Sequence, residues 1–486
     1  MQGSHSAHRS DARRAPYAPG SGTDNPVRAL PLRFTNPGFP EAEKEKIVTI
    51  KLRNARLIDG TGAEPYLAEI VIEGQRIVSV AAEGTGERQD SDATVVDVGG
   101  ATVMPGLIDA HSHPSFLPEI DLAKMGNLPV EEHTLLTARN ARLMLDQGFT
   151  SILCAASAKP RLDLVVRNEI NAGNLIGPRM LVASPELTVT GGVGDVRLPH
   201  MHRQSVEHVC DGVDQFRQTT RWYMREGVDH MKLDISGDEF IPYAKGRMTT
   251  MTDEEVAATC QVAHARGKRV AAHARSAESV KMCVRHGIEI IFHADFTDEE
   301  GLDLVAENKD KHFVAPAFGF LHTSRYEAGD WGLTPEVTAS MGLDEQLESL
   351  IANMIELKKR GVRVLPGGDY FVPWNPMGNN ARDLEHFVNF LEFSPMEAIE
   401  SATRLGGELM LQPDDLGCIK AGYLADLLVL DGDPLEDIAI LQNQSTFTGI
   451  MKDGVWHKEP PLSRSGDVEK WSISASAAGA PEPVLR

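Results

Sequence analysis

Residues 101–113 read ATVMPGLIDAHSH, an apolar run of strand length that ends in the pair His111 and His113. Seven further apolar runs follow it, separated by amphipathic stretches. The eight runs cover residues 101–113, 150–156, 179–187, 230–236, 269–274, 289–294, 312–318 and 363–370. A repeated strand-helix unit gives parallel strands with right-handed crossovers, and eight such strands can close a barrel. The sequence therefore predicts an α/β fold, a (β/α)8 TIM barrel.

The stretches between the runs are typical of helices. Residues 135–148, 213–227 and 252–267 carry apolar residues near 3.6 spacing, and each ends in glycine, as capped helices often do. The alternative is a doubly wound open sheet, which a glycine-rich fingerprint after the first strand would favour. Here the first strand ends in His-Ser-His, so the barrel is favoured.

Short strands with turn signals occupy both ends of the chain. Asp-Gly pairs at Asp431-Gly432 and Asp453-Gly454 suit hairpins. We expect the two ends to pair into one small β-sandwich domain. The predicted division is a flexible N-terminal tail (1–45), the first part of the β domain (46–103), the barrel (104–414), the second part of the β domain (415–465) and a C-terminal tail (466–486).

Composition limits the partners. With 48 Lys+Arg against 70 Asp+Glu, the net charge of −22 repels phosphate backbones and anionic lipid, so we expect neither nucleic acid nor membrane as a partner. The five cysteines are odd in number and scattered, which predicts neither a disulfide framework nor a cysteine zinc site. We expect a cytoplasmic homo-oligomer that acts on a small-molecule substrate.

Metal-binding residue types close several of the eight runs. In a parallel barrel the chemistry lies at the C-terminal ends of the strands. There the sequence places imidazoles, a lysine and a carboxylate, which are His111, His113, Lys232, His273, His293 and Asp369. A single histidine at a strand end is more often an ordinary hydrogen-bonded residue, but six such residues at matching places predict a centre for divalent transition metals.

Three of these residues have further features that favour a metal centre. His111 and His113 are two residues apart on a strand, so their side chains share a face and can bind one ion. Lys232 lies inside an apolar run, where an ammonium without a counter-ion would cost several kcal/mol. Carboxylation to an anionic carbamate would remove that cost, and the carbamate could bridge two cations.

At these residues the chain resembles the amidohydrolase superfamily of metal-dependent hydrolases. Residues 103–113 (VMPGLIDAHSH) are similar to its first-strand motif, and residues 422–438 (GYLADLLVLDGDPLEDI) to its return into the small β domain. Within the superfamily the chain is similar to the imidazolonepropionase-like and prolidase-like branch. The segments at residues 293–304, 320–336 and 366–374 resemble sequences of the group that contains phenylurea and molinate hydrolases.

The resemblance implies two ions in each chain, zinc foremost, with cobalt, manganese or iron as alternatives. His111, His113 and Asp369 would hold the more buried ion, His273 and His293 the more exposed one, and carboxylated Lys232 would bridge them. A metal-bound hydroxide would attack a carbonyl carbon. Asp369, the expected catalytic residue, would take its proton and pass it to the leaving nitrogen.

Two departures from the branch affect the substrate. Arg275 and Val193 stand where many relatives have histidines that touch the substrate. The expected substrate-binding residues are Arg197, Arg275, His322, Tyr326, Tyr370, Phe371 and Trp374. Because loops near the expected mouth are rich in aromatic residues, we predict burial of a hydrophobic substrate.

The predicted reaction is cleavage of an amide-like C–N (or C–S) bond in a small, neutral, hydrophobic urea, carbamate, thiocarbamate or anilide. Alternatives within the superfamily are a dipeptidase or acyl-amino-acid hydrolase, and a cyclic amidase or deaminase. A non-enzymatic barrel with a vestigial metal site is less favoured, because all six expected ligand positions are filled.

Overall fold

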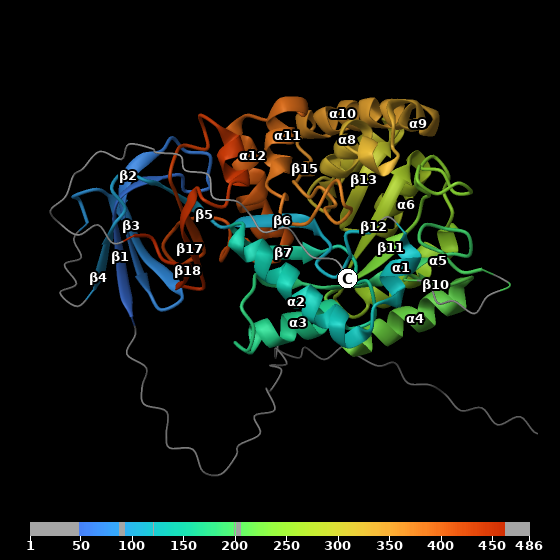
Figure 1. Cartoon of the computed structure of the whole chain (residues 1–486), viewed down its shortest axis with the longest axis horizontal. Helices are drawn as coiled ribbons and strands as arrows, with labels where there is room; N and C mark the ends of the chain where they lie inside the picture. The colour runs from blue at the N-terminus through green and yellow to red at the C-terminus, as the bar shows by residue number, and fades with distance from the viewer. Residues whose placement is uncertain (1–47, 87–92, 120, 199, 201–205, 462–486) are drawn as a thin grey trace, which may run out of the picture. The chain divides into compact units, whose positions relative to one another are not determined.

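The structure is a computed structural model, which describes residues 48–86, 93–119, 121–198, 200 and 206–461. The predicted tails, 1–45 and 466–486, lie outside the described residues. The described part is a mixed α/β structure with two parallel sheets and one further sheet built from both ends of the chain (Figure 1).

The sheet from the chain ends has eight strands, in the order β18-β17-β16-β5-β1-β2-β3, with β4 paired to β1. Its two halves join where β5 and β16 run antiparallel. The strands are β1 (Thr49–Leu57), β2 (Tyr66–Glu73), β3 (Arg76–Ala82), β4 (Thr94–Asp97), β5 (Thr102–Pro105), β16 (Leu427–Leu430), β17 (Phe447–Lys452) and β18 (Val455–Lys458). The predicted pairing of the chain ends is therefore present, within one continuous sheet.

The two Asp-Gly pairs behave differently. Asp453 and Gly454 both have positive φ, 50° and 73°, and form the two-residue turn between β17 and β18. Asp431-Gly432 does not make such a turn, because residues 431–446 form a longer connection before β17. The expectation of a tight hairpin is confirmed at Asp453-Gly454 and wrong at Asp431-Gly432.

Strands occur in all eight apolar runs of the sequence. One parallel sheet has the order β10-β9-β11-β12-β13-β14-β15 and the other β6-β7-β8. These strands are β6 (Leu107–Ser112), β7 (Phe149–Cys154), β8 (Arg179–Leu181), β9 (Ala183–Thr188), β10 (His208–Val209), β11 (His230–Asp234), β12 (Arg269–Ser276), β13 (Ile290–Phe296), β14 (Phe313–Ala315) and β15 (Arg363–Val364).

Two features connect these parallel sheets. Val182 alone separates β8 from β9, so the third run contributes to both sheets. At the other margin, the amide of Ala110 donates to the carbonyl of Pro366 over 3.1 Å, and Ser112 pairs with Tyr370 in a parallel bridge. The first and eighth runs are therefore hydrogen-bonded neighbours.

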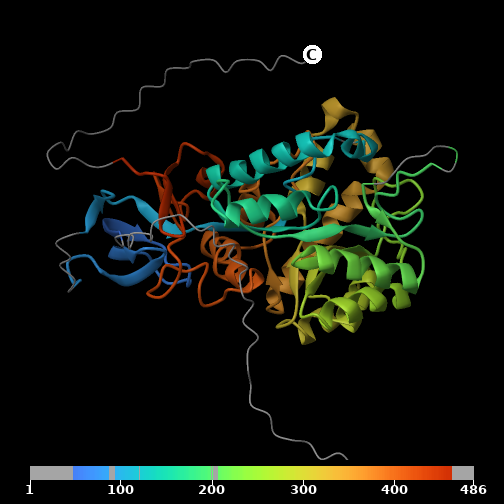
Figure 2. The ribbon, with the colours of Figure 1, turned by 90° about the horizontal axis from the view of Figure 1, so that it is seen from below.

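Helices flank the parallel strands (Figures 1 and 2). Thr252 and Glu255 form a capping box that begins α5, and Gly227 ends α4 with a left-handed φ of 101°. The helices are α1 (Leu122–Asn127), α2 (Val130–Asp146), α3 (Leu162–Asn171), α4 (Val213–Glu226), α5 (Asp253–His264), α6 (Ala277–His286), α7 (Glu299–Glu307), α8 (Phe318–Tyr326), α9 (Pro335–Met341), α10 (Leu343–Lys359), α11 (Arg382–Phe390), α12 (Pro395–Ala402) and α13 (Arg404–Leu409).

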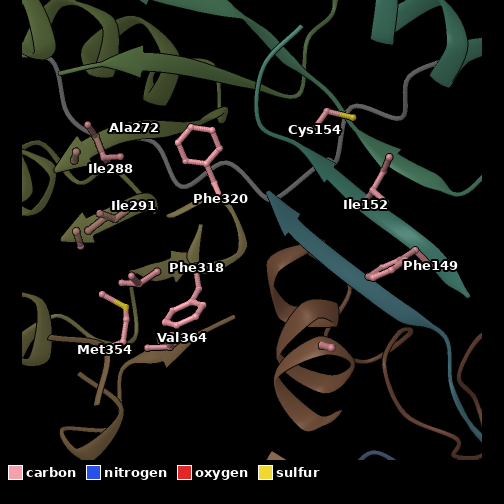
Figure 3. Packing of buried hydrophobic residues seen from close by; sticks show 14 of the residues in the cluster. Phe149, Ile152, Cys154, Ala272, Ile288, Ile291, Phe318, Phe320, Met354 and Val364 are labelled. Carbon is pink, nitrogen blue, oxygen red and sulfur yellow. The ribbon is translucent and has the colours of Figure 1, made fainter. Parts of the chain in front are cut away.

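The largest core lies between the parallel strands and their helices. Every residue of β7, β11 and β13 is buried, as expected when both faces of a parallel sheet are covered. Figure 3 shows members of this core, including Phe318, Met354 and Val364. Within the described ranges, no helix has the length and apolar character needed to cross a bilayer.

Arg179 joins β8 to the eight-stranded sheet. Its guanidinium contacts Asp426 at 2.7 Å and also pairs with Asp453, and its side chain is 16% exposed. Arg179→Ala would leave the buried Asp426 without its cation and Asp453 with Lys452 alone. We therefore expect a loss of about 3 kcal/mol in the free energy of unfolding, measured in urea. Arg225→Ala, at a side chain 73% exposed beside Glu226, is the control and should cost less than about 1 kcal/mol. Equal losses would contradict this role of Arg179.

Candidate metal centre and active site

The six predicted ligand residues meet in one pocket. His111 lies in β6 and His113 directly after it, while Lys232, His273 and His293 come from β11, β12 and β13. Asp369 lies five residues after the end of β15. All six line a cavity of about 220 Å³. Their convergence follows from the parallel register, which pairs Asp234 with His273 and Ala274 with His293.

The tightest group contains His111, His113 and Asp369. The Nε2 atom of His113 lies 3.1 Å from Asp369 Oδ1, and the Nε2 atom of His111 lies 3.7 Å from the same oxygen. One possible ligand atom from each residue lies within 4.8 Å of the others, and all three residues are buried. This arrangement can hold one cation.

The second pair is adjacent. The ring centroids of His273 and His293 lie 4.3 Å apart, and His111 lies 5.3 Å from His293. His273 Nε2 lies 3.0 Å from the carbonyl of Gly237. When that nitrogen donates its proton to the carbonyl, Nδ1 keeps a free lone pair, and such a contact is the usual way to fix the tautomer of a metal-ligating histidine.

The protonation states suit a metal. Burial lowers the pKa of His111 and His293 well below the usual value and that of His273 to about 4, so these imidazoles are neutral near pH 7. Burial alone would raise the pKa of Asp369, but His111 and His113 hold it below its ordinary range. Asp369 Oδ1 and the Nδ1 atoms of His111, His113 and His293 are buried without a hydrogen-bond partner. This donor set fits a divalent transition metal.

The surroundings of Lys232 differ from the expectation. Its Nζ lies 2.8 Å from Glu186 Oε1 and 3.6 Å from Asp234 Oδ1. Burial lowers the pKa of Lys232, but these two carboxylates raise it above its usual value overall. Lys232 therefore has two acidic partners, contrary to the expectation from the sequence. Sequence reasoning missed Glu186, although it lies near the end of the third run, where the strand-end rule could have found it.

Arg275 is enclosed rather than open to the pocket. It is 1% exposed, its Nε donates to Asp238 Oδ2 over 2.9 Å, and its Nη1 pairs with Asp295. Gln346 also donates to Asp295, over 2.6 Å. Burial lowers the pKa of Arg275, but the two carboxylates raise it above its ordinary value. Asp238, which the sequence analysis did not select, lines the pocket in its place.

The other predicted substrate residues divide into two groups. Phe371 and Trp374 line the pocket, and Val193 lies there too. The lining does not include Arg197, His322, Tyr326 or Tyr370. Arg197 forms an ion pair with Asp195 at 2.7 Å, Tyr326 is 61% exposed, and the Tyr370 hydroxyl donates to Asp383. His322 packs against Phe318 and His386.

The pocket wall is mainly apolar. Besides the six ligand positions, its charged members are Glu186, Glu207 and Asp238. The remaining described residues of the wall are Phe116, Leu122, Val193, Phe240, Ile241, Phe320, Phe371, Val372 and Trp374. The wall thus contains five aromatic rings, those of Phe116, Phe240, Phe320, Phe371 and Trp374.

Comparison with known proteins agrees with this geometry. The model of the amidohydrolase family matches residues 102–457, which include every ligand position. This chain belongs to the amidohydrolase family. It is therefore a hydrolase that acts on C–N bonds, with a cluster of histidine and aspartate suited to a metal.

Among characterised relatives, this amidohydrolase is 25% identical to ochratoxinase of Aspergillus niger over 434 residues, covering 85% of this chain and 87% of the relative. A crystal structure of a prolidase complexed with N-methylphosphonate-L-proline matches with a TM-score of 0.75 and 25% identity, covering 85% of this chain and all of the other. Molinate hydrolase matches with a TM-score of 0.68 at 19% identity over 88% and 99% of the two chains, a likeness of fold.

The buried position of Arg275 generates a test. Arg275→Ala would leave Asp238 and Asp295 as buried carboxylates without their cation, so this amidohydrolase should lose about 3 to 5 kcal/mol in the free energy of unfolding. Arg197→Ala is the control, because its side chain is 40% exposed, and its effect should stay below about 1 kcal/mol. Urea titrations followed by circular dichroism measure both. An Arg275→Ala protein of unchanged stability would contradict the enclosed ion-pair network.

Proposed function

We propose that this amidohydrolase cleaves an amide-like C–N (or C–S) bond in a small, neutral, hydrophobic urea, carbamate, thiocarbamate or anilide. The observation that carries the proposal is the pairing of a metal-type donor set with an apolar wall. Lys232 is the one basic side chain among the described lining residues apart from histidines, and Glu186 and Asp234 already neutralise it. A substrate carboxylate would therefore find no available cationic side chain in the described wall.

We also propose that the parallel strands form a closed (β/α)8 barrel. The support is the passage of one run from β8 into β9 across Val182, together with the bridge between Ser112 and Tyr370. A closed barrel would gather the ends of all eight strands at one mouth, where the ligand positions converge.

The proposed metal site has two ions, with zinc as the first candidate. His111, His113 and Asp369 would hold one ion, and His273 and His293 the other. When bound, divalent ions polarise a substrate carbonyl and bring the pKa of water near neutrality. Asp369 would accept the proton of the attacking water and transfer it to the leaving nitrogen. Phe371 and Trp374 would exclude bulk water and bury the apolar part of the substrate.

Lys232 would bridge the ions as a carbamate. The ammonium would first lose a proton to solvent, and the neutral amine would then add to carbon dioxide, forming an N–C bond and releasing a second proton. The anionic product would lie beside Glu186 and Asp234, which presently stabilise the ammonium. Because three neighbouring anions repel one another in a buried site, carboxylation of Lys232 and metal binding should depend on each other.

A second candidate function is hydrolysis of dipeptides or acyl amino acids, because the prolidase structure in complex with a proline derivative is 25% identical to this chain. The two candidates differ in whether the substrate must carry a carboxylate. A substrate panel should therefore contain compounds with a carboxylate and compounds without one.

Chelation should abolish turnover. Removal of divalent ions leaves the imidazoles and Asp369 without the cation that activates water, so turnover should fall below about 1% of that of the loaded enzyme and return when zinc or cobalt is added. Amine release measures activity, and elemental analysis measures the metal content of the same samples. Full activity in metal-free protein would exclude the proposed mechanism.

Uncharged aryl ureas, carbamates and anilides should show higher kcat/KM than Xaa-Pro dipeptides and N-acyl amino acids. Trp374→Ala should raise KM more than it lowers kcat, because the side chain contributes apolar burial at about 25 cal/mol per Å². Tyr326→Ala is a matched control, since this side chain is exposed and outside the pocket lining. A strict requirement for a substrate carboxylate would favour the second candidate instead.

A further inference from the structure

Asp369 has an unusual backbone conformation. Its φ is 57°, in the left-handed region that residues other than glycine rarely adopt. It follows the glycine pair Gly367-Gly368 on the segment after β15. The position of its carboxylate beside His113 therefore depends on how the surrounding structure holds this segment.

A buried carboxylate from α11 accepts hydrogen bonds from residues before and after Asp369 in the chain. Asp383 is fully buried, and its Oδ2 accepts the amide of Gly367 over 3.1 Å. Its Oδ1 accepts the hydroxyl of Tyr370 over 3.1 Å. The same oxygen accepts the amide of Gly319, at the start of α8, over 3.1 Å. One side chain therefore joins the two flanks of Asp369 to the neighbouring helix.

Further hydrogen bonds complete this support. The side-chain amide of Asn375 donates to the carbonyl of Gly368 over 3.0 Å and to that of Asp369 over 3.3 Å. The amide of Phe320, a residue of the pocket wall, donates to the carbonyl of Gly368 over 2.9 Å. The segment that bears the metal ligand and the helix that bears part of the wall are therefore one hydrogen-bonded unit.

The packing around Asp383 leaves no room for a Cβ atom at two neighbouring glycines. A methyl group on Gly368 would lie 2.5 Å from Asp383 Oδ1 and 2.2 Å from Tyr370 Cε2. A methyl group on Gly319 would lie 2.9 Å from Asp383 Oδ1. Both glycines are thus required for the close approach of backbone to this carboxylate.

The donors to Asp383 explain why a carboxylate is used. Two are backbone amides and one is a phenol, and His386 Nδ1 lies 3.3 Å from Oδ1. An ionised carboxylate accepts through both oxygens, whereas an amide of the same shape has one accepting oxygen and a donating NH2 group. We propose that Asp383 is a positioning residue that fixes Asp369 for metal binding, assisted by Asn375. The inference rests on the proposed role of Asp369 as a ligand.

The test is Asp383→Asn, which keeps the shape and turns one acceptor into a donor. The zinc dissociation constant, measured by competition with a chromophoric chelator, should rise about tenfold to hundredfold. In the metal-free protein, hydrogen exchange at the amide of Gly367 should become faster, since its acceptor is weakened. Neither measurement requires a substrate.

Leu52→Ala is the control for lost stability. Leu52 is fully buried in β1 of the eight-stranded sheet, so its truncation destabilises the protein without contact with the site. Its zinc affinity should remain that of the wild type. If Asp383→Asn does not fold, Tyr370→Phe and Asn375→Ser provide the test, and each should weaken zinc binding in the same direction.

The outcomes separate this inference from the proposed function. Wild-type zinc affinity and unchanged exchange in folded Asp383→Asn, or wild-type affinity in both folded substitutes, would overturn the positioning role alone. A wild-type protein that binds zinc but hydrolyses no compound of the panel would contradict the proposed function alone. Equal weakening of zinc binding by Leu52→Ala would show a general effect of stability and would also overturn the positioning role.

Discussion

The carboxylate of Asp369 lies buried against the imidazoles of His111 and His113, and much of the structure serves to keep it there. A buried charge is costly unless it is paired, and burial lowers the pKa of His111, so its neutral imidazole supplies a lone pair rather than positive charge. The cluster is therefore a place where a cation is favoured. The parallel strands bring the histidines together, and the left-handed backbone at Asp369 turns its carboxylate toward them.

Buried charge around this centre is organised into small groups. Lys232 lies between Glu186 and Asp234, and Arg275 pairs with Asp238 and Asp295. Each group contains one basic and two acidic side chains, so acidic side chains outnumber basic ones near the proposed ligand positions. That balance suits divalent ions and leaves the described pocket wall without a free basic group for a substrate anion.

The strands and the residues nearest to the proposed metal ions could mostly be predicted from the sequence. The eight strand positions and the six proposed ligand residues follow from local rules, namely apolar runs of strand length and the residue that closes each run. Glu186 also lies near a strand end, but its role as a partner of Lys232 depends on the register between β9 and β11. Arg275 was expected to face substrate, but its orientation depends on Asp295 and α10, which lie far along the chain. Asp383 belongs to no sequence motif. Two of its donors are backbone amides, which leave no signal in the sequence.

The most direct measurement is a crystal structure of the zinc-loaded protein with anomalous diffraction at the zinc edge. The account predicts anomalous peaks beside His111, His113 and Asp369 and beside His273 and His293, with carbamate density extending from Lys232 Nζ between them. Zinc bound elsewhere, or a fully metallated site in which Lys232 remains a bare ammonium paired with Glu186, would contradict it.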